Sequence, residues 1–342
     1  MKRLPCIATT LLSSGLLLPA TATADANFYA SVRVSALATD NDDGSDAELT
    51  DNSSRIGVHG RHEIGDGTAL VGRLEVGVNT VEGSFGGGEA NRLAYLGLES
   101  DLGGIYLGTQ WSPYYLAVGG STDRFNALGA RHTHAVERLT HSLKYAASLS
   151  VISLETALVM RDNSEAADTR FAVDPDSGEI TATSIAAVED EDTIDRIQFA
   201  GTFRAKRATI ALAVDHKADS GVSGSAGNVV GIATTYEDDT LIGAVSFHNT
   251  DKERLDAQWA GDQALKQVEL YAGYKFAGTN LLHIAYGQSD DGSRTPSTLT
   301  LGFQHQISET ARIWVEGETT HPDQPDTGNE HLLAVGIRYN WE

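Results

Sequence analysis

Side chains in residues 53–79, SSRIGVHGRHEIGDGTALVGRLEVGVN, alternate between apolar and charged with a period of two. Ile56 and Val58 belong to the apolar set, and Arg55 and His59 to the charged set. Successive side chains of a β-strand point to opposite faces, so this pattern predicts strands with one apolar and one charged face. The GDGT between the two runs is typical of a tight hairpin turn. A fold for this chain must therefore give each strand two different surroundings.

The chain begins with the features of a secretory signal peptide. Two basic residues precede an apolar stretch at 11–18, and small residues form a cleavage site that ends at Ala24. We expect residues 1–24 to be removed and residues 25–342 to form one domain. The only cysteine, Cys6, lies within the signal, so the sequence predicts neither disulfides nor thiolate metal sites in the exported protein.

Composition narrows the class further. A formal net charge of −22 repels nucleic acid, so we expect no nucleic-acid partner. After the signal, no apolar run reaches the roughly 18–20 residues that a membrane-spanning helix needs. Glycine is abundant and proline scarce, with 35 and 7 residues, which suits a β-rich chain with many tight turns.

Alternation bounded by turn residues predicts sixteen strands. They span residues 27–39, 53–63, 68–79, 91–100, 104–111, 136–147, 149–161, 193–203, 207–216, 227–236, 239–249, 264–275, 278–289, 296–306, 310–320 and 330–341. The connections alternate between short and long, so one end of the sheet carries tight turns and the other carries loops. This is the asymmetry of an up-and-down antiparallel barrel in an outer membrane.

The two faces of the strands distinguish a membrane barrel from a secreted β-sandwich. In the strand at 264–275, Val268 and Leu270 alternate with Gln267 and Glu269, and a sandwich would alternate in the same way. The number of strands, the aromatic residues at strand ends and the missing cysteines favour the barrel. A sheet can cross lipid only when it is closed, and sixteen strands enclose a water-filled lumen.

Several segments resemble the Gram-negative general diffusion porins. SRIGVHGRHEIGDGTALVGRLE is similar to a strand-turn-strand motif of that family, and NRLAYLGLESDLGGIYLGTQWSPYY to a later motif that ends in Gly-Arg-Gln and a proline. FYASVRVSAL resembles the opening strand, and AVGIRYNW the closing strand. The resemblance implies a 16-stranded trimeric barrel that forms an outer-membrane channel, with the third external loop folded into the lumen.

The resemblance also implies a pore constriction, in which arginines of the wall face acidic residues of the third loop. It places this loop at residues 112–135. Arg55 and Arg92 match wall positions of the family, and alternation points both inward. The other residues expected at the constriction are Arg33, Arg73 and Arg138 on the wall, with Lys144 extending it, Asp123 on the loop and Glu137 at the loop's exit. Without the resemblance, an inward arginine is an ordinary solvated residue of a lumen.

A second loop is expected to contact a neighbouring subunit. In the family this loop reaches over the adjacent barrel of a homotrimer, and the resemblance assigns the role to Glu82, Gly83, Ser84 and Phe85.

The sequence departs from the family at two points. The family's Gly-Arg-Gln is Gly108-Thr109-Gln110 here, so one basic residue of the constriction is missing. The terminal Phe, which the family uses for assembly, is replaced by Trp341 and Glu342.

The loop at 162–192 is strongly acidic, with Arg170 as its only basic residue. An acidic mouth concentrates cations at low salt. The same composition also suits a saline habitat, or divalent cations that bridge lipopolysaccharide. Inward arginines act in the opposite direction. On balance, the sequence predicts passive diffusion of ions and small hydrophilic solutes, with cations preferred.

Two other functions stay open. One is a substrate-specific channel of the same barrel type, for a small organic acid, a sugar or phosphate, although residues 112–135 show neither an aromatic slide nor a lysine-rich loop. The other, more remote, is an outer-membrane barrel enzyme, although the chain has no G-x-S-x-G motif. His132 and His134 form an H-x-H pair that can chelate a metal, but histidines near a constriction more often form hydrogen bonds. We expect no catalytic residue, metal or cofactor.

Overall fold

The computed structural model describes residues 25–86, 91–129, 132–133, 135–160, 169–173, 180–184, 194–218, 226–255, 263–324 and 327–341, so the predicted signal peptide lies outside the described residues. Sixteen antiparallel strands form a closed barrel, and each predicted strand has its counterpart. They are β1 (Asp25–Asn41), β3 (Arg55–Gly65), β4 (Thr68–Asn79), β6 (Asn91–Ser100), β7 (Gly103–Trp111), β8 (Arg138–Leu149), β9 (Ile152–Met160), β12 (Ile194–Ala205), β13 (Ala208–Lys217), β14 (Gly227–Glu237), β15 (Leu241–Thr250), β16 (Leu265–Phe276), β17 (Asn280–Asp290), β18 (Ser297–Gln306), β19 (Ala311–His321) and β20 (Glu330–Trp341).

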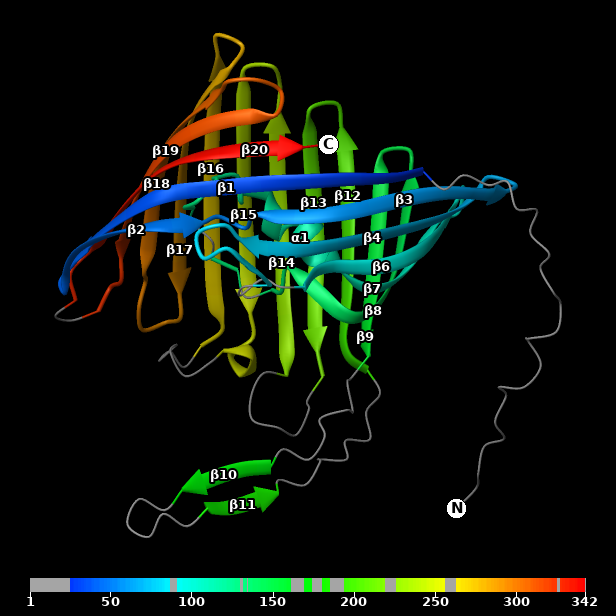
Figure 1. The fold of residues 1–342 in the computed structure, drawn as a ribbon, viewed down its shortest axis with the longest axis horizontal. Helices are drawn as coiled ribbons and strands as arrows, with labels where there is room; N and C mark the ends of the chain where they lie inside the picture. The colour runs from blue at the N-terminus through cyan, green and yellow to red at the C-terminus, as the bar shows by residue number, and fades with distance from the viewer. Residues whose placement is uncertain are drawn as a thin grey trace.

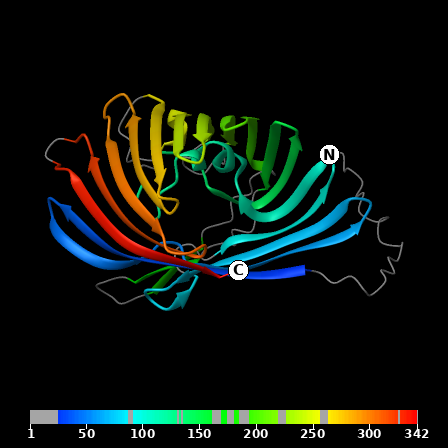
Figure 2. The same ribbon diagram turned by 90° about the horizontal axis from the view of Figure 1, so that it is seen from above.

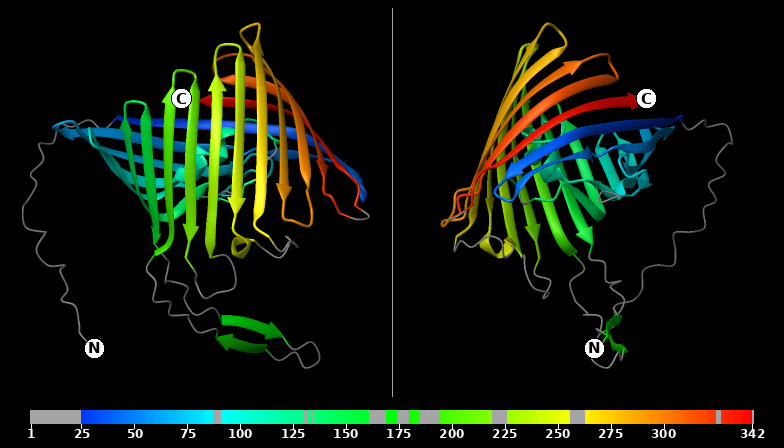
Figure 3. Two further views of the ribbon diagram at one scale, coloured as in Figure 1. Left: turned by 180° about the vertical axis from the view of Figure 1, so that it is seen from behind. Right: turned by 60° about the vertical axis from the view of Figure 1, so that its left-hand side comes forward.

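The first and last strands close the barrel (Figures 1 and 3). β1 pairs with β20 on one side, where Val34 lies opposite Ile337, and with β3 on the other, where Ser31 lies opposite Arg55. The other strands of the barrel pair with their neighbours in chain order. Every barrel strand therefore has two partners, and no strand edge is left for lipid or for another chain.

Shorter elements lie in the connections and were not predicted from alternation. β2 (Gly44–Asp51) pairs with the second half of β1, and β5 (Ser84–Phe85) pairs with the end of β4. The remaining elements are the two-stranded sheet of β10 (Thr169–Val173) and β11 (Ile180–Ser184), the helix α1 (Pro113–Ala117), and the short 3₁₀ turns η1 (Gly119–Ser121) and η2 (Lys252–Arg254). Within the described residues, no helix combines the length and the apolar character needed to span a bilayer.

The outer face of the barrel is apolar and the inner face is polar. In β16, Leu270 and Tyr274 are exposed on the outside, whereas Gln267 and Glu269 are buried on the inside. A soluble sandwich would bury its apolar face between two sheets, and this barrel exposes that face over its circumference. The faces assigned from the sequence are therefore correct, and the apolar one is suited to contact with hydrocarbon.

Aromatic rings gather at strand ends near the short turns. Tyr339 and Trp341 pack edge to face with ring centroids 4.4 Å apart, and Phe276 lies 6.4 Å from Phe303. Rings of this kind suit the level of the lipid headgroups, where one side of the ring is apolar and the other is wet.

The turn between β3 and β4 has the conformation that its sequence predicts. Asp66 and Gly67 both have positive φ angles, +50° and +71°. A two-residue turn of this type twists in the same sense as the strands that it joins, and asparagine, aspartate and glycine tolerate it best.

Residues 112–137, which we call the inner loop, join β7 to β8, and the helix α1 of this loop lies inside the ring of strands. Figure 2 shows α1 within the barrel, against the wall of green and yellow strands. Tyr114 and Val118 are fully buried there against alanines of β12, β13 and β14. At Gly231 a Cβ atom would lie 2.3 Å from Tyr114 Oη, so only glycine fits. Small residues on this wall make room for the loop.

We expect the two faces of β12 to differ sharply in their tolerance of charge. Phe199→Arg places a cation on the exposed apolar face near the middle of the strand and should lower the free energy of unfolding from lipid by about 2–4 kcal/mol. Thr202→Arg, on the lumen side of the same strand, is the matched control and should change it little. Urea titrations of protein folded into vesicles measure both values, and equal losses would contradict the assignment of faces.

Candidate functional site: an arginine-lined lumen

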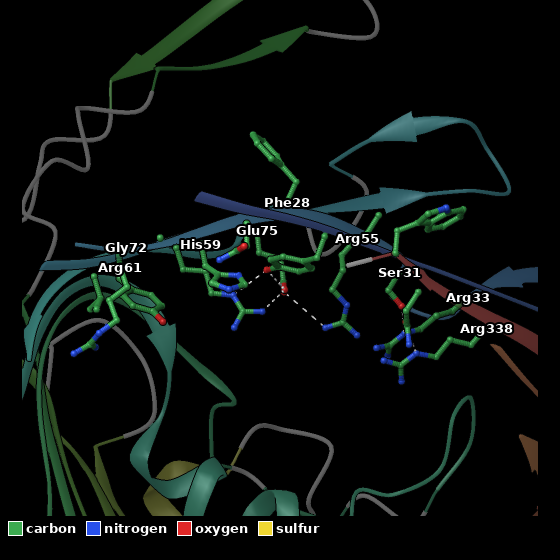
Figure 4. Close-up of a pocket in the computed structure, with 18 of the residues that line it drawn as sticks. Phe28, Ser31, Arg33, Arg55, His59, Arg61, Gly72, Glu75 and Arg338 are labelled. Carbon is green, nitrogen blue, oxygen red and sulfur yellow. Dashed lines mark hydrogen bonds and ion pairs between the residues drawn. The ribbon is translucent and has the colours of Figure 1, made fainter. Parts of the chain in front are cut away.

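Each of six neighbouring strands contributes an arginine to one surface of the lumen, and β3 carries a second, more exposed one, Arg61, nearer the short turn. We call this set the arginine wall. In the order in which the strands pair, its members are Arg312 on β19, Arg338 on β20, Arg33 on β1, Arg55 on β3, Arg73 on β4 and Arg92 on β6. Figure 4 shows Arg33, Arg55 and Arg338 pointing from the strands into the lumen. Four of the six were expected at the constriction from the sequence, and the structure brings them onto one surface.

A single buried carboxylate organises one half of this wall. Glu75 on β4 accepts a hydrogen bond of 2.8 Å from Arg92 Nε, and another of 3.1 Å from Arg73 Nη2. Arg55 Nη1 lies 3.7 Å from the same carboxylate. The phenol of Tyr29 donates to Glu75 at 2.7 Å and accepts from Arg73 Nε at 2.9 Å. One negative charge therefore holds three positive charges in place, and the group keeps a net positive charge.

The other half of the wall has neutral partners. Arg33 Nε donates to Ser31 Oγ at 3.0 Å, and Arg338 Nε donates to Asn340 Oδ1 at 2.9 Å. Arg312 Nη1 donates to the side-chain oxygen of Gln304 at 3.1 Å. Each of these bonds orients a guanidinium without cancelling its charge.

Arg138 and Glu137, which were also expected at the constriction, lie at the start of β8. Arg138 Nη1 is 4.0 Å from the carboxylate of Glu137, and its guanidinium covers the ring of Trp111 at 5.1 Å. Lys144, further along β8, pairs with Glu155 at 3.4 Å. β7, between β6 and β8, contributes no arginine, because Thr109 stands where the family has one.

Carboxylates of β19, the strand that also carries Arg312, hold the later part of the inner loop. Glu316 on β19 accepts backbone hydrogen bonds of 2.7–2.9 Å from Asn126, Ala127 and Leu128, and Glu318 accepts one of 2.9 Å from Gly129. Backbone N–H groups that bind a buried carboxylate satisfy a charge that would otherwise be costly to bury. These acids therefore act as anchors of the loop.

Other contacts fasten the loop along its length. Tyr114 Oη lies 2.8 Å from Nδ1 of His248 on β15. Burial, together with the carboxylate of Asp215, raises the pKa of the Tyr114 phenol, so it stays neutral. Phe125 stacks on the ring of His283 with centroids 4.1 Å apart. Asp123, the acid expected to face the arginines, accepts a hydrogen bond of 2.8 Å from Tyr115 within the loop.

The structure does not assemble a metal site from its described residues. His132 donates its backbone N–H to Glu269, and its Nδ1 lies 2.7 Å from Ser289 Oγ, whereas His134 lies outside the described residues. Most of the acidic loop at 162–192 is outside them too.

Aspartates order the described parts of the other loops. Asp323 accepts a backbone hydrogen bond of 2.6 Å from Thr295, and this bond lowers the pKa of Asp323.

The loop predicted to contact a neighbouring subunit forms a tight turn after β4. The side chain of Asn79 accepts backbone hydrogen bonds from Val81 and Glu82, and Gly83 has a φ of +68°. Ser84 and Phe85 then pair back onto β4. Phe85 is 74% exposed, so this turn presents a large apolar ring at the surface of the single chain.

A family model described as Gram-negative porin matches residues 8–326. The chain belongs to this family. It is therefore an outer-membrane protein, and the expected family and location are confirmed. A search of curated proteins finds no match to this porin.

Solved porin structures share the fold at low sequence identity. An anion-selective porin from Comamonas acidovorans is 15% identical with a TM-score of 0.70, and the match covers 93% of this chain and all of that one. OmpF of Salmonella typhi, solved with daunomycin, also has 15% identity and a TM-score of 0.70, over 92% of this chain and 97% of that one. A trimer form of OmpT from Vibrio cholerae is 15% identical with a TM-score of 0.64, and the match covers 93% of this chain and 99% of that one.

Three residues of the site were not among the expected constriction residues. Alternation placed Glu75 and Arg338 on the inward face of their strands, but not as members of the site. Arg312 lies just after a short turn, and no sequence motif identified it as a residue of the site. A signal was present for the first two, because a charged residue on the lumen face of a strand is a candidate for the pore.

Glu75 should be the most sensitive position of the arginine wall. Glu75→Gln leaves the buried Arg92 without its carboxylate, and breaking a buried ion pair in this way costs about 3 kcal/mol. We expect a lower unfolding temperature of the detergent-solubilised protein. Glu99→Gln is the control, because Glu99 pairs with the exposed Arg61 and its loss should matter little. An unchanged unfolding temperature for Glu75→Gln would show that the carboxylate does not organise the wall.

Proposed function

We propose that this porin is a general diffusion channel whose narrowest zone lies between the arginine wall and the inner loop. One observation carries the proposal: the arginines of adjacent strands line the same lumen as the inner loop, whose helix α1 packs against β12, β13 and β14 on the other side of the closed barrel. Membership of the porin family supports an open channel for passive diffusion. The positive charges of the arginine wall support a constriction between this wall and the inner loop.

The constriction would act on solutes through their size and polarity. Arg55 and Arg92 would extend from one side, and Asp123 of the inner loop would lie on the other. A field across the opening orders water and orients polar solutes, so apolar molecules of the same size are disfavoured. Arg33, Arg73, Arg138 and Glu137 would widen this charged zone along the lumen.

Two opposing charge distributions would set the ion preference. The acidic loops enrich cations at low salt, which is the basis for the expected cation preference. The arginine wall has more positive charge than its carboxylates balance, and it favours anions where the lumen is narrow. Salt screens solvent-exposed charges strongly and partly buried charges of a lumen less. We therefore infer a preference for cations at low salt that weakens or reverses at high salt.

A substrate-specific channel of the same barrel type is the second candidate, and the arginine wall favours anionic substrates over sugars. An enzymatic role has less support, because the described polar residues of the lumen are engaged in holding the loop and the arginines. We propose a non-enzymatic channel that needs no cofactor.

We also propose a homotrimer, in line with the trimer form of the Vibrio cholerae protein. The turn of Glu82, Gly83, Ser84 and Phe85 would reach the adjacent subunit, with Phe85 as the apolar anchor. Lipopolysaccharide, bridged by divalent cations at the acidic loops, would surround the assembly.

Arg55 provides the test of the constriction. Arg55→Glu should raise the cation-to-anion permeability ratio by about threefold, because two units of charge change beside the narrow path. The reversal potential in a salt gradient across a planar bilayer measures this ratio. Arg61→Glu makes the same change of charge on the same face of β3, but nearer the short turn and with a side chain that is 50% exposed, so it should have a smaller effect. Equal reversal potentials for the two variants and the unmodified channel would remove Arg55 from the constriction.

Phe85 provides the test of the subunit contact. Phe85→Ala should lower the temperature at which the trimer dissociates in detergent, because buried aromatic anchors at interfaces contribute more than about 1 kcal/mol each. Leu102→Ala is the control, since Leu102 is also exposed, at 84%, but lies in the short turn between β6 and β7. The proposal fails if both variants dissociate at the temperature of the unmodified trimer.

A further inference from the structure

Three arginines of the wall lie directly opposite one another on adjacent strands. Arg33 on β1 pairs in register with Arg338 on β20, and Arg338 pairs in register with Arg312 on β19. Residues in register on one face of a sheet are in contact distance, and like charges placed in this way destabilise the pair. Such a row needs a compensating negative charge.

The described protein does not supply this charge. Within the part of the chain that the structure describes, none of the three arginines forms an ion pair, and their hydrogen-bond partners are the neutral Ser31, Asn340 and Gln304. Glu316 is the nearest acid on β19, but its two oxygens already accept the backbone N–H groups of the inner loop.

The free donors of this row face an open space. A guanidinium has five N–H donors, and the bonds above use one from each arginine. Arg33, Arg338 and Arg55 line a cavity of about 690 Å³ together with the polar side chains of Ser31 and Asn340. Figure 4 shows the guanidinium groups of Arg33 and Arg338 side by side at the edge of this cavity, with Arg55 beside them.

We propose that Arg33 and Arg338, flanked by Arg55 and Arg312, form a binding site for a small multivalent oxyanion of the phosphate class. The planar fork of arginine binds two oxygens of one anion, so a tetrahedral dianion can bridge two neighbouring guanidinium groups. A chloride ion offers no such pair of acceptors. The site rests on the proposed channel and deepens it, because an anion held here occupies the path of diffusing solutes.

The row shares this cavity with Glu75 but lies nearer to the short turns. Arg312 is the second residue of β19 and Arg338 lies near the end of β20, so both are close to the short turns. An oxyanion that enters or leaves through the short-turn end of the barrel meets this row. Binding should therefore be visible as a concentration-dependent reduction of chloride current.

Inorganic phosphate, at a pH where it is a dianion, is the probe. It should reduce the chloride current of single channels in planar bilayers with a saturating midpoint, at low salt where screening is weak. Arg338→Gln should raise this midpoint about tenfold, the loss expected for one charge-assisted bidentate contact. Arg33→Gln should act in the same direction. Both variants remove repulsion from the row, so their unfolding temperatures should not fall.

Arg207→Gln is the matched control. It removes one positive charge from an exposed short turn at the same end of the barrel, outside the cavity, and the midpoint should stay within about twofold. If phosphate has no effect on a channel that conducts chloride, or if Arg207→Gln shifts the midpoint as much as Arg338→Gln, the site is excluded while the diffusion channel stands. A lower midpoint for succinate than for phosphate would overturn the phosphate class. Failure to form any conducting channel would overturn the proposed function itself.

Discussion

The pairing of backbone polar groups in a medium without water is the constraint on which this structure depends. Hydrocarbon offers no partner to an unpaired N–H or C=O group, so each strand must be bonded on both sides. The pairing of β1 with both β20 and β3 meets this requirement. Once the sheet is closed, successive side chains of each strand face lipid and the water of the lumen in turn. Charged residues in the lipid-facing middle of the strands must then lie inside, and the lumen becomes a surface on which charges face one another.

The inner face of the barrel is not uniform: one side packs against the inner loop, and the other carries the arginine wall. On β12, β13 and β14 it consists largely of alanine and glycine, which leave space for Tyr114 and Val118 of the inner loop. On the opposite side the strands carry the arginine wall, held by Glu75 in one half and by neutral side chains in the other. Carboxylates of the wall, Glu316 and Glu318, bind the loop through its backbone. The acidic residues of this lumen therefore act largely as structural partners, and the arginines are the charges that solutes meet.

The sequence was informative where a residue has only two possible surroundings. Sixteen strands followed from alternation, because each position of a barrel strand faces either lipid or water. The connections are not subject to that rule, so β2, the β10–β11 hairpin and α1 were missed. Arg55 and Arg92 were found through motif resemblance and face. The row of Arg33, Arg338 and Arg312 could not be found, because these residues are far apart in the chain and become neighbours only when the register of β19, β20 and β1 is known. Glu75 could be recognised as an inward charge, but its pairing with Arg55, Arg73 and Arg92 could not be predicted.

The seam between β1 and β20 has a consequence for biogenesis. β1 and β20 are far apart in the chain but adjacent in the sheet, so the barrel cannot close before β20 has been inserted between β19 and β1. A protein without β20 would leave unpaired edges on β1 and β19, which could pair with strands of another protein. Insertion of β20 is therefore a step on which closure of the whole sheet depends.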